Sequence, residues 1–200
     1  MIHDYQRCVS CVMDTSDPKI VFDARGVCDH CNNFYKNILP SWLPLPSSLE
    51  SFTERIQKQG RNRDFDCIIG MSGGVDSSYL TYYVTRKLGL RPLVFHVDAG
   101  WNSQIAVNNI EKLVDGLKLD LYTEVIDWES MKDLQLAFFK SGVPHIDTPQ
   151  DHAYFATMYK FASKYGIKTI LTGANLSTEC LRNPIEWMYY QSDSTQLLDI

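Results

Sequence analysis

The sequence lacks a long uninterrupted run of apolar residues. Nowhere do about eighteen uncharged apolar residues follow one another, and residues 1–20 hold no apolar segment of the length that a secretory signal needs. Internal repeats and low-complexity tracts are absent as well. We therefore expect a soluble, cytoplasmic protein that is not inserted into a membrane.

An excess of basic residues is also missing. The chain has 19 Lys and Arg against 24 Asp and Glu, a formal net charge of -5 at pH 7 and a pI near 5.5. Binding to a nucleic-acid backbone depends on many cationic side chains that release counterions. The charge balance argues against a large basic surface, although it leaves room for a local one, and we expect no nucleic-acid partner.

Length and composition limit the number of domains. The chain has 200 residues, of which 44% are hydrophobic, enough for one core and a small appendage. Three prolines between residues 40 and 48 predict an extended connector, and a short helix is expected over residues 49–58. We expect a small module over residues 1–39, a linker with the short helix over residues 40–60, and a main domain over residues 61–200.

Hydrophobic patterns alternate along the main domain. Short apolar runs predict strands at residues 65–71, 91–100, 120–127 and 168–173. Helical periodicity fills the segments between them. This alternation is typical of an α/β fold, a Rossmann-like parallel sheet with helices on both faces. Ligands of such sheets bind at the carboxyl ends of the strands, here after residues 71, 98, 127 and 173.

A glycine-rich turn follows the first predicted strand. Its residues are Ser72, Gly73, Gly74, Val75, Asp76, Ser77 and Ser78. Paired glycines let successive backbone N–H groups face an anion, the following helix adds its positive end, and the serines add hydroxyl donors. We expect the turn to bind the phosphates of ATP, with Asp76 holding Mg²⁺ beside them. A strand-to-helix turn without a ligand is the alternative interpretation.

The turn differs from two other phosphate-binding motifs, because it lacks the GK[ST] of the lysine-bearing P-loop and the dinucleotide GxGxxG. SGGVDSS resembles instead the signature of the PP-loop ATP pyrophosphatases, which have an adenine nucleotide alpha hydrolase-like fold and include NAD synthetase, GMP synthetase and several tRNA-modifying enzymes. The resemblance implies that ATP is split between its α and β phosphates, with the turn holding pyrophosphate while an acceptor is adenylated.

Two later segments resemble the same superfamily. HVDAGW at residues 96–101 is similar to the end of its second strand, and TGAN at residues 172–175 to the end of its fourth. The resemblance implies that Asp98 and Ala99 contact the adenosine and that Gly173 lets the nucleotide approach. A strand terminus followed by a turn is the alternative for each segment.

Four cysteines form two CxxC pairs. Cys8 and Cys11 are separated from Cys28 and Cys31 by sixteen residues, a spacing typical of a four-thiolate zinc site. Four thiolates leave no open coordination position, so we expect a structural, zinc-ribbon-like module that the metal helps to fold. An iron–sulfur cluster or a redox dithiol is the competing interpretation.

Three further residues receive no ligand role. His30 is expected to be a solvated loop residue, and Cys67 lies in the middle of a predicted strand and is expected in the core. Cys180 has no histidine near it in the sequence. No segment therefore offers a glutaminase, and ammonia would come from solution or from a partner protein.

A longer resemblance runs over residues 5–190. RCVSCVMD, GVCDHCNNF, SGGVDSS, HVDAGW, TPQDHA and TGANLSTE follow one another as in the N-acetyl sugar amidotransferases of surface-polysaccharide (lipopolysaccharide) biosynthesis, the WbpG type. The resemblance implies an ATP-dependent ligase that converts the acetamido group of a nucleotide-activated sugar into an acetamidino group. It also implies that a separate glutaminase, paired with a cyclase-like subunit, supplies the ammonia.

Polar residues at the functional edge are candidates for the acceptor site. These are Asp151, His152, Asn175 and Glu179, and Asp76 and Ser77 complete the expected catalytic set. Arg182 is a candidate for neutralising pyrophosphate. The structural alternatives are that Asp151 caps a helix and that His152 and Arg182 are exposed surface residues.

Two other functions remain open at this point. A tRNA-modifying sulfurtransferase also joins a PP-loop to CxxC pairs, although the acidic charge argues against it. A non-catalytic chain that binds nucleotide and docks the ammonia-producing partner is the other. Members of the amidotransferase family extend past the position of Ile200, which leaves open that this chain is a fragment lacking much of the sugar site.

Overall fold

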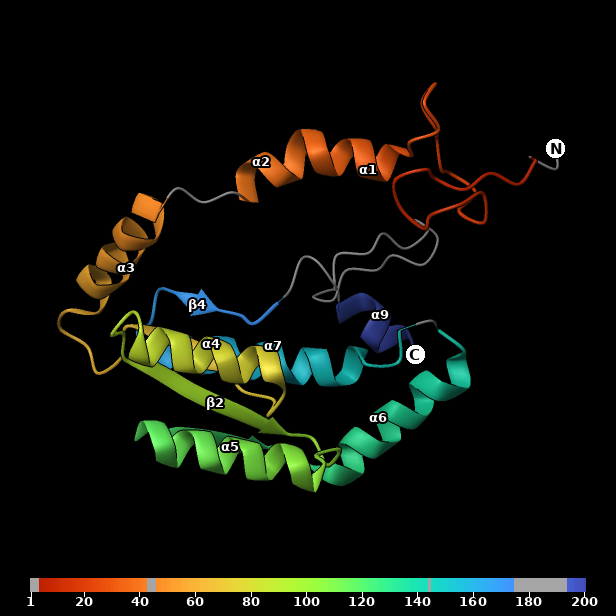
Figure 1. Ribbon diagram of the computed structural model, residues 1–200. Helices are drawn as coiled ribbons and strands as arrows, with labels where there is room; N and C mark the ends of the chain where they lie inside the picture. The colour runs from red at the N-terminus through yellow and green to blue at the C-terminus, as the bar shows by residue number, and fades with distance from the viewer. Residues whose placement is uncertain (1–3, 43–45, 144, 175–193) are drawn as a thin grey trace. The chain divides into compact units, whose positions relative to one another are not determined.

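The computed structural model describes residues 4–42, 46–143, 145–174 and 194–200 (Figure 1). The described residues divide into two units, one up to Glu50 and the other from Ser51 on.

The second unit is built on a parallel sheet of four strands in the order β3-β2-β1-β4. All its described strand pairs are parallel, and in their registers Gly70 pairs with Phe95 and Asp98 with Val125. The strands are β1 (Cys67–Gly70), β2 (Pro92–Asp98), β3 (Leu121–Val125) and β4 (Ile170–Leu171). The helices are α3 (Pro46–Gly60), α4 (Val75–Arg86), α5 (Gln104–Leu117), α6 (Trp128–Ser141), α7 (Thr148–Lys164) and α9 (Ser194–Asp199).

Local sequence signals explain where two of these helices begin. The side chain of Ser103 accepts a hydrogen bond from the backbone N–H of Ala106 and caps α5 (3.2 Å). Asp127 caps α6 in the same way by accepting from Ser130 (2.9 Å). Such caps satisfy backbone donors that the helix itself leaves without an acceptor. The carboxyl ends of β2 and β3 are thereby followed by well-defined helix starts.

Hydrophobic side chains pack on both faces of the sheet. On one face, Phe161 of α7 packs with Ile68, Leu93 and Phe95. On the other face, separate clusters join the sheet to α3 and α4 and to α5. The predicted α/β sheet with helices on both faces is confirmed. Cys67 lies in this core as predicted, and burial, with the nearby charge of Asp66, raises its pKa to about 12.

The described part of the first unit has little apolar packing. Its helical segments are α1 (Asp29–Asn33), η1 (Phe34–Ile38) and α2 (Leu39–Trp42), and its two isolated bridges join Arg7 to Asp14 and Phe22 to Cys28. Among its described side chains, Cys8 and Cys28 are the only buried apolar ones. This agrees with the expectation that the segment needs a metal to pack.

The prediction of an extended connector over residues 40–48 is wrong at both ends. Leu39–Trp42 is helical, and α3 begins at Pro46 rather than after Ser48. Proline is compatible with the first turn of a helix, where its missing N–H needs no partner. β4 is also shorter than residues 168–173, because its pairing with β1 is limited to Ile170 and Leu171.

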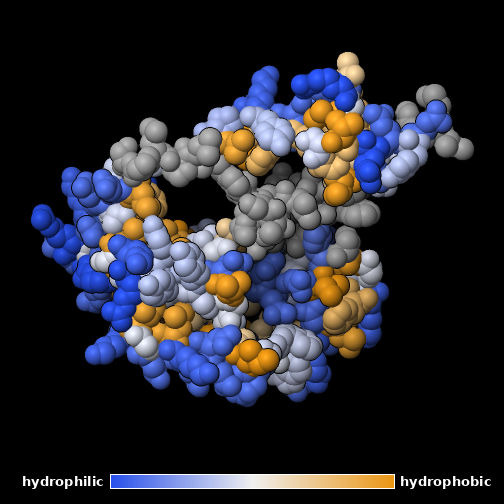
Figure 2. Space-filling model, in the orientation of Figure 1, coloured by the Kyte–Doolittle hydropathy of each residue, from blue (hydrophilic) through white to orange (hydrophobic). Residues whose placement is uncertain are grey.

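Hydrophilic residues predominate on the outer sides of α3 and α5, at the left and bottom of Figure 2. Within the part of the chain that the structure describes, no helix combines the length and the apolar character needed to cross a bilayer.

An ion pair ties the ends of three elements together. The buried carboxylate of Asp66 accepts hydrogen bonds from the guanidinium of Arg91 (2.7 and 3.1 Å) and from its backbone N–H (2.8 Å). The same guanidinium donates to the carbonyl of Gly60, the last residue of α3 (2.9 Å). The pair therefore joins the end of α3 to the starts of β1 and β2.

We expect Arg91→Met to lower the free energy of unfolding by about 1–3 kcal/mol, because the buried Asp66 carboxylate loses its strongest donors. Urea denaturation measures the change. Lys132→Met is the control, since Lys132 forms an exposed ion pair with Glu129 (3.1 Å), and its loss should cost less than about 1 kcal/mol. Equal losses in the two variants would contradict the role given to Arg91.

Candidate functional site

Helix α5 packs closely against the turn after β1. Gly73 has a φ of 78°, and a Cβ at this position would lie 2.4 Å from the carbonyl oxygen of Ala106. The side-chain amide of Asn109 donates to the carbonyl of Gly73 (3.1 Å). Position 73 therefore requires glycine for its backbone conformation and for the close approach of α5.

Hydroxyl groups and helix amides face outward from this turn. Gly74 is the N-cap of α4, and the backbone amides of the helix's first turn have no acceptor within the helix. The hydroxyls of Ser72 and Ser77 lie 3.2 Å apart, and the Ser72 hydroxyl accepts from the N–H of Gly74 (3.3 Å). This arrangement offers several hydrogen-bond donors and the positive end of a helix to an anion.

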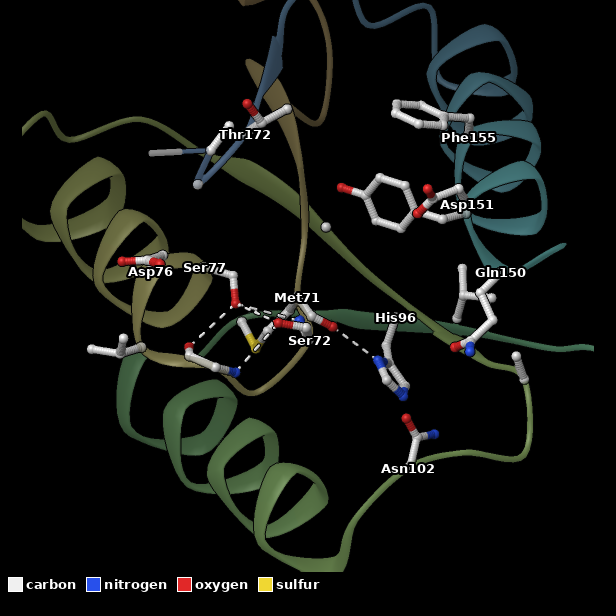
Figure 3. A pocket seen from close by; sticks show the side chains of 18 residues that line it. Met71, Ser72, Asp76, Ser77, His96, Asn102, Gln150, Asp151, Phe155 and Thr172 are labelled. Carbon is white, nitrogen blue, oxygen red and sulfur yellow. Dashed lines mark hydrogen bonds between the residues drawn. The ribbon is translucent and has the colours of Figure 1, made fainter. Parts of the chain in front are cut away.

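A cavity of about 690 Å³ opens beside the turn at the carboxyl edge of the sheet (Figure 3). Its described walls come from the ends of β1, β2 and β4 and from α7. The volume lies within the range of about 300–1,000 Å³ that is usual for small-molecule sites. No described residue directly after β3 lines this cavity, so the predicted ligand contact after residue 127 is wrong. β3 is an edge strand and is separated from β1 by β2.

The chain after β4 closes the cavity from another side. A Cβ at Gly173 would lie 3.0 Å from the backbone nitrogen of Ser77 and 3.0 Å from the carbonyl carbon of Asp76. Gly173 therefore lets this segment approach the first turn of α4. Its predicted role, letting a nucleotide approach, stays a prediction.

One face of α7 forms the wall opposite the turn. Gln150, Asp151, Tyr154 and Phe155 all line the cavity, as expected for positions three to five residues apart on a helix. In Figure 3, Gln150 and Asp151 lie across the cavity from Ser77. Asp151 does not cap the helix, because α7 begins at Thr148 with Asp147 as its N-cap. The alternative of a helix cap is therefore wrong, and Asp151 belongs to the cavity.

Burial raises the pKa of Asp151, and the charge of Asp147 acts in the same direction, while His152 and His145 oppose it. A carboxyl group whose pKa is raised is a better proton acceptor than an ordinary carboxylate. Asp76 lies on the other side of the cavity, exposed at the start of α4, where its carboxylate could hold a cation next to a bound phosphate.

The structure brings together some of the residues predicted from the sequence. Those that line the cavity are Ser72, Gly74, Val75, Asp76, Ser77, Ala99, Asp151 and Gly173. Gly73 and Ser78 line a smaller hollow of about 440 Å³ behind the turn. Four residues singled out in the sequence lie outside the described residues: Asn175, Glu179, Cys180 and Arg182.

Two predicted residues lie apart from the cavity wall. Asp98 accepts a hydrogen bond from the N–H of Gly100 (3.0 Å) and so shapes the turn after β2. The ring of His152 is not an exposed surface group as one interpretation held, because its Nε2 is buried, with no hydrogen-bond partner among the described residues.

Sequence reasoning missed His96 and Tyr154. His96 is buried in β2, and its Nδ1–H donates to the carbonyl of Met71, the residue just before the turn (2.8 Å, Figure 3). The polar His96 within an apolar strand was the available signal. Tyr154 carried no signal, because an aromatic residue in a predicted amphipathic helix is typical of core packing.

In the first unit, the four CxxC cysteines come together. Their sulfur atoms all lie within 4.8 Å of one another, with Cys11 and Cys28 at 3.6 Å and Cys8 and Cys31 at 4.0 Å. These separations are too long for a disulfide. In a tetrahedral zinc site with Zn–S bonds of about 2.3 Å, neighbouring sulfur atoms lie about 3.8 Å apart. The two S–S distances lie on either side of this value. The geometry fits zinc held by four thiolates.

The clustered thiols differ in how readily they ionise. Burial opposes ionisation of Cys8, but backbone N–H donors from Cys28, Ser10 and Cys11 lower its pKa to about 6. Burial, helped by the Cys11 thiol, raises the pKa of Cys31 to about 12. Four thiolates so close together repel one another unless a cation neutralises them.

His30 differs from its prediction as a solvated loop residue. It lies in α1, and its ring nitrogen Nε2 is 3.0 Å from the carboxylate of the buried Asp17. It is not among the clustered sulfur ligands. The residue therefore helps to hold the cysteine segment together rather than pointing into solvent.

No protein-family model and no curated protein sequence matches the chain. Similar solved structures include an NH₃-dependent NAD synthetase from Campylobacter jejuni, at 16% identity over 64% of this chain and 56% of that one, with a TM-score of 0.46. An NMN synthetase from Francisella tularensis has 17% identity over 64% and 55%, with a TM-score of 0.44.

A glutamine-dependent NAD⁺ synthetase from Acinetobacter baumannii, solved with ADP, has 19% identity over 62% of this chain and 24% of that one, with a TM-score of 0.49. The chain therefore spans little more than half the length of the first two structures and about a quarter of the third. Similarity of this size carries no argument about function, which has to rest on the site itself.

We expect Gly73→Ala to weaken the binding of pyrophosphate and ATP by at least about tenfold, or about 1.4 kcal/mol, because the new Cβ collides with α5 and moves the turn. Isothermal calorimetry measures the affinity. Gly89→Ala is the matched control, since Gly89 also has a positive φ of 63° but its Cβ would meet nothing within 4 Å. Unchanged binding in Gly73→Ala would remove the turn as the anion site.

We expect the purified chain to carry one zinc ion, measured by elemental analysis. In a Cys180→Ser background, the four clustered thiols should resist a thiol reagent until a chelator removes the metal. Cys67 should stay unreactive until the protein unfolds, because its thiol is buried with a pKa of about 12. Visible absorbance and iron in the preparation would instead indicate an iron–sulfur cluster.

Proposed function

We propose that this chain binds ATP with Mg²⁺ at the turn between β1 and α4 and adenylates an acceptor, with release of pyrophosphate. The observation that carries the proposal is the position of the turn. Its hydroxyls and the amides of α4 meet at one wall of a cavity whose opposite wall is α7. An acceptor held by α7 would face the inner phosphates of a nucleotide whose terminal phosphates occupy the turn.

The chemistry of the turn supports pyrophosphate as the leaving group. The turn has no lysine of the kind that P-loop enzymes place on a transferring γ-phosphoryl group. Its serine hydroxyls and helix amides are suited to hold two terminal phosphates in place while the bond to the α-phosphorus breaks. Mg²⁺ held by Asp76 would neutralise charge on the departing pyrophosphate.

The acceptor that fits best is a neutral amide. Among the described residues that line the cavity there is no Lys or Arg, and the carboxyl groups there belong to Asp76 and Asp151. A carboxylate acceptor would meet an acidic wall without a cation to pair with. An acetamido group carries no charge and can hydrogen-bond to Gln150 and Asp151. This supports the N-acetyl group of a nucleotide-activated sugar, the substrate class that the sequence resemblance implies.

The reaction then takes place in two steps. The amide oxygen bonds to the α-phosphorus as the bond to pyrophosphate breaks, and the amide N–H passes its proton to Asp151, which leaves a neutral O-adenylyl imidate. Ammonia adds to the imidate carbon, and AMP leaves with the former amide oxygen. After loss of a proton the product is an acetamidino group, and its carbon has kept the same oxidation state.

Ammonia is proposed to come from a separate glutaminase paired with a cyclase-like subunit, as the family resemblance implies. Cys67 is unsuited to a glutaminase reaction, because its thiol is buried with a pKa of about 12. The zinc module is proposed to have a structural role, since four thiolates leave the metal no open position.

The test is to mix the protein with MgATP, ammonium and a panel of UDP-linked N-acetyl sugars and to quantify the nucleotide products. We expect one AMP and one pyrophosphate for each acetamidino sugar formed, detected by mass spectrometry as an amide oxygen replaced by NH. Sugars with a free amine in place of the acetamido group are the control and should give no AMP. Formation of ADP and orthophosphate would contradict the proposed cleavage site, and tight, salt-sensitive binding of tRNA would favour the sulfurtransferase.

A further inference from the structure

Tyr154 lies over the carboxyl end of β1 in a contact that only glycine permits. A Cβ added to Gly70 would lie 2.2 Å from the hydroxyl oxygen of Tyr154 and 2.7 Å from its Cζ. The hydroxyl therefore lies against the backbone of the last residue of β1, two positions before Ser72. Any side chain at position 70 would displace it.

Aromatic packing fixes the Tyr154 ring in this position. Its centroid lies 5.2 Å from that of Phe95, which is fully buried in β2, and 5.4 Å from that of Phe155. The side chain is part of the cavity wall. Burial raises the pKa of Tyr154, so the hydroxyl remains protonated around neutral pH and can act as a hydrogen-bond donor.

The Tyr154 hydroxyl lies between the glycine-rich turn and Asp151, the two parts of the proposed site. Gly70 leads directly into the turn that faces the terminal phosphates, while Asp151 lies one helical turn before Tyr154 on α7 and also lines the cavity. A nucleotide with its terminal phosphates at the turn and an acceptor at Asp151 would bring the α-phosphorus between them.

We propose that Tyr154 is a catalytic residue whose hydroxyl donates a hydrogen bond to a non-bridging oxygen of the α-phosphoryl group during adenylation. The inference rests on the proposed function and adds the group that stabilises its transition state. As the amide oxygen bonds to the α-phosphorus and the bond to pyrophosphate breaks, negative charge shifts among the oxygens on that phosphorus. A donor already held in place stabilises this charge without reorganising, and Tyr154 transfers no proton.

Tyr154→Phe is the direct test, because it removes the hydroxyl and keeps the ring that packs on Phe95. We expect kcat for AMP formation to fall about 10²-fold, as for the loss of other preorganised donors, with the KM for ATP changed by less than about threefold. Tyr159→Phe is the matched control: the same substitution on the same helix, at a side chain that is 62% exposed. It should leave kcat unchanged.

The two diastereomers of ATPαS locate the hydrogen bond. Each replaces one non-bridging α-oxygen by sulfur, which is a weak acceptor. Tyr154→Phe should cost about 10²-fold with ATP and with one diastereomer, and only a few-fold with the diastereomer whose sulfur replaces the bonded oxygen. Equal losses with all three substrates would place the hydroxyl elsewhere in the reaction and overturn the inference.

The remaining outcomes separate the inference from the function on which it rests. If the wild-type protein forms AMP and pyrophosphate and Tyr154→Phe does so at the same rate, the role of Tyr154 is refuted while the function stands. If the wild-type protein forms neither product with any acceptor, the proposed function fails, and the role of Tyr154 fails with it.

Discussion

Two close backbone approaches determine the shape of the turn on which the site depends. The main chain of α5 at Ala106 meets Gly73, and the chain after β4 meets the first turn of α4 at Gly173. The first contact leaves no space for a Cβ, and at the second a Cβ would force the neighbouring backbone to shift. Because the turn is held from both sides, the amides at the start of α4 are already oriented. An anion that binds there would therefore lose little binding free energy to ordering them. The third constraint is His96, which holds the carbonyl of Met71 just before the turn.

The two opposite walls of the cavity are both starts of helices, and each carries a carboxyl group, Asp76 on α4 and Asp151 on α7. They differ in their other polar groups. The turn before α4 adds serine hydroxyls and backbone amides that suit phosphate, while α7 adds the side chains of Gln150 and Tyr154. In the proposed reaction the terminal phosphates would lie at the turn and the acceptor at α7, with the bond to be broken between them, near the Tyr154 hydroxyl.

The first unit, which holds the four clustered cysteines, buries few apolar side chains in its described part. Cys8 and Cys28 are buried, and the buried Asp17 is paired with His30. Because the described part of this unit has no apolar core, we expect it to gain much of its folding free energy from the zinc ion that its four cysteines could bind. The backbone donors around the Cys8 sulfur lower its pKa to about 6, which would favour one thiolate for such a metal. We therefore expect metal binding and folding of this unit to occur together.

Patterns between near neighbours in the sequence were sufficient for the sheet strands, the glycine-rich turn and the four clustered cysteines. Each depends on spacings of a few residues, such as the apolar run before Ser72 or the pairs of Cys8 with Cys11 and Cys28 with Cys31. The helix boundaries around residues 40–48 were predicted wrongly, because Pro40 and Pro46 are compatible with a helix start as well as with a connector.

The tertiary structure alone decided which strand ends share the cavity and which helix faces the turn. The order β3-β2-β1-β4 separates the end of β3 from that cavity, and the position of α7 brings Asp151 and Tyr154 into it. Strand order and helix placement depend on contacts between residues far apart in the chain, and local periodicity does not encode them. The contact of Tyr154 with Gly70 spans 84 positions (154 − 70), so neither residue alone indicated it.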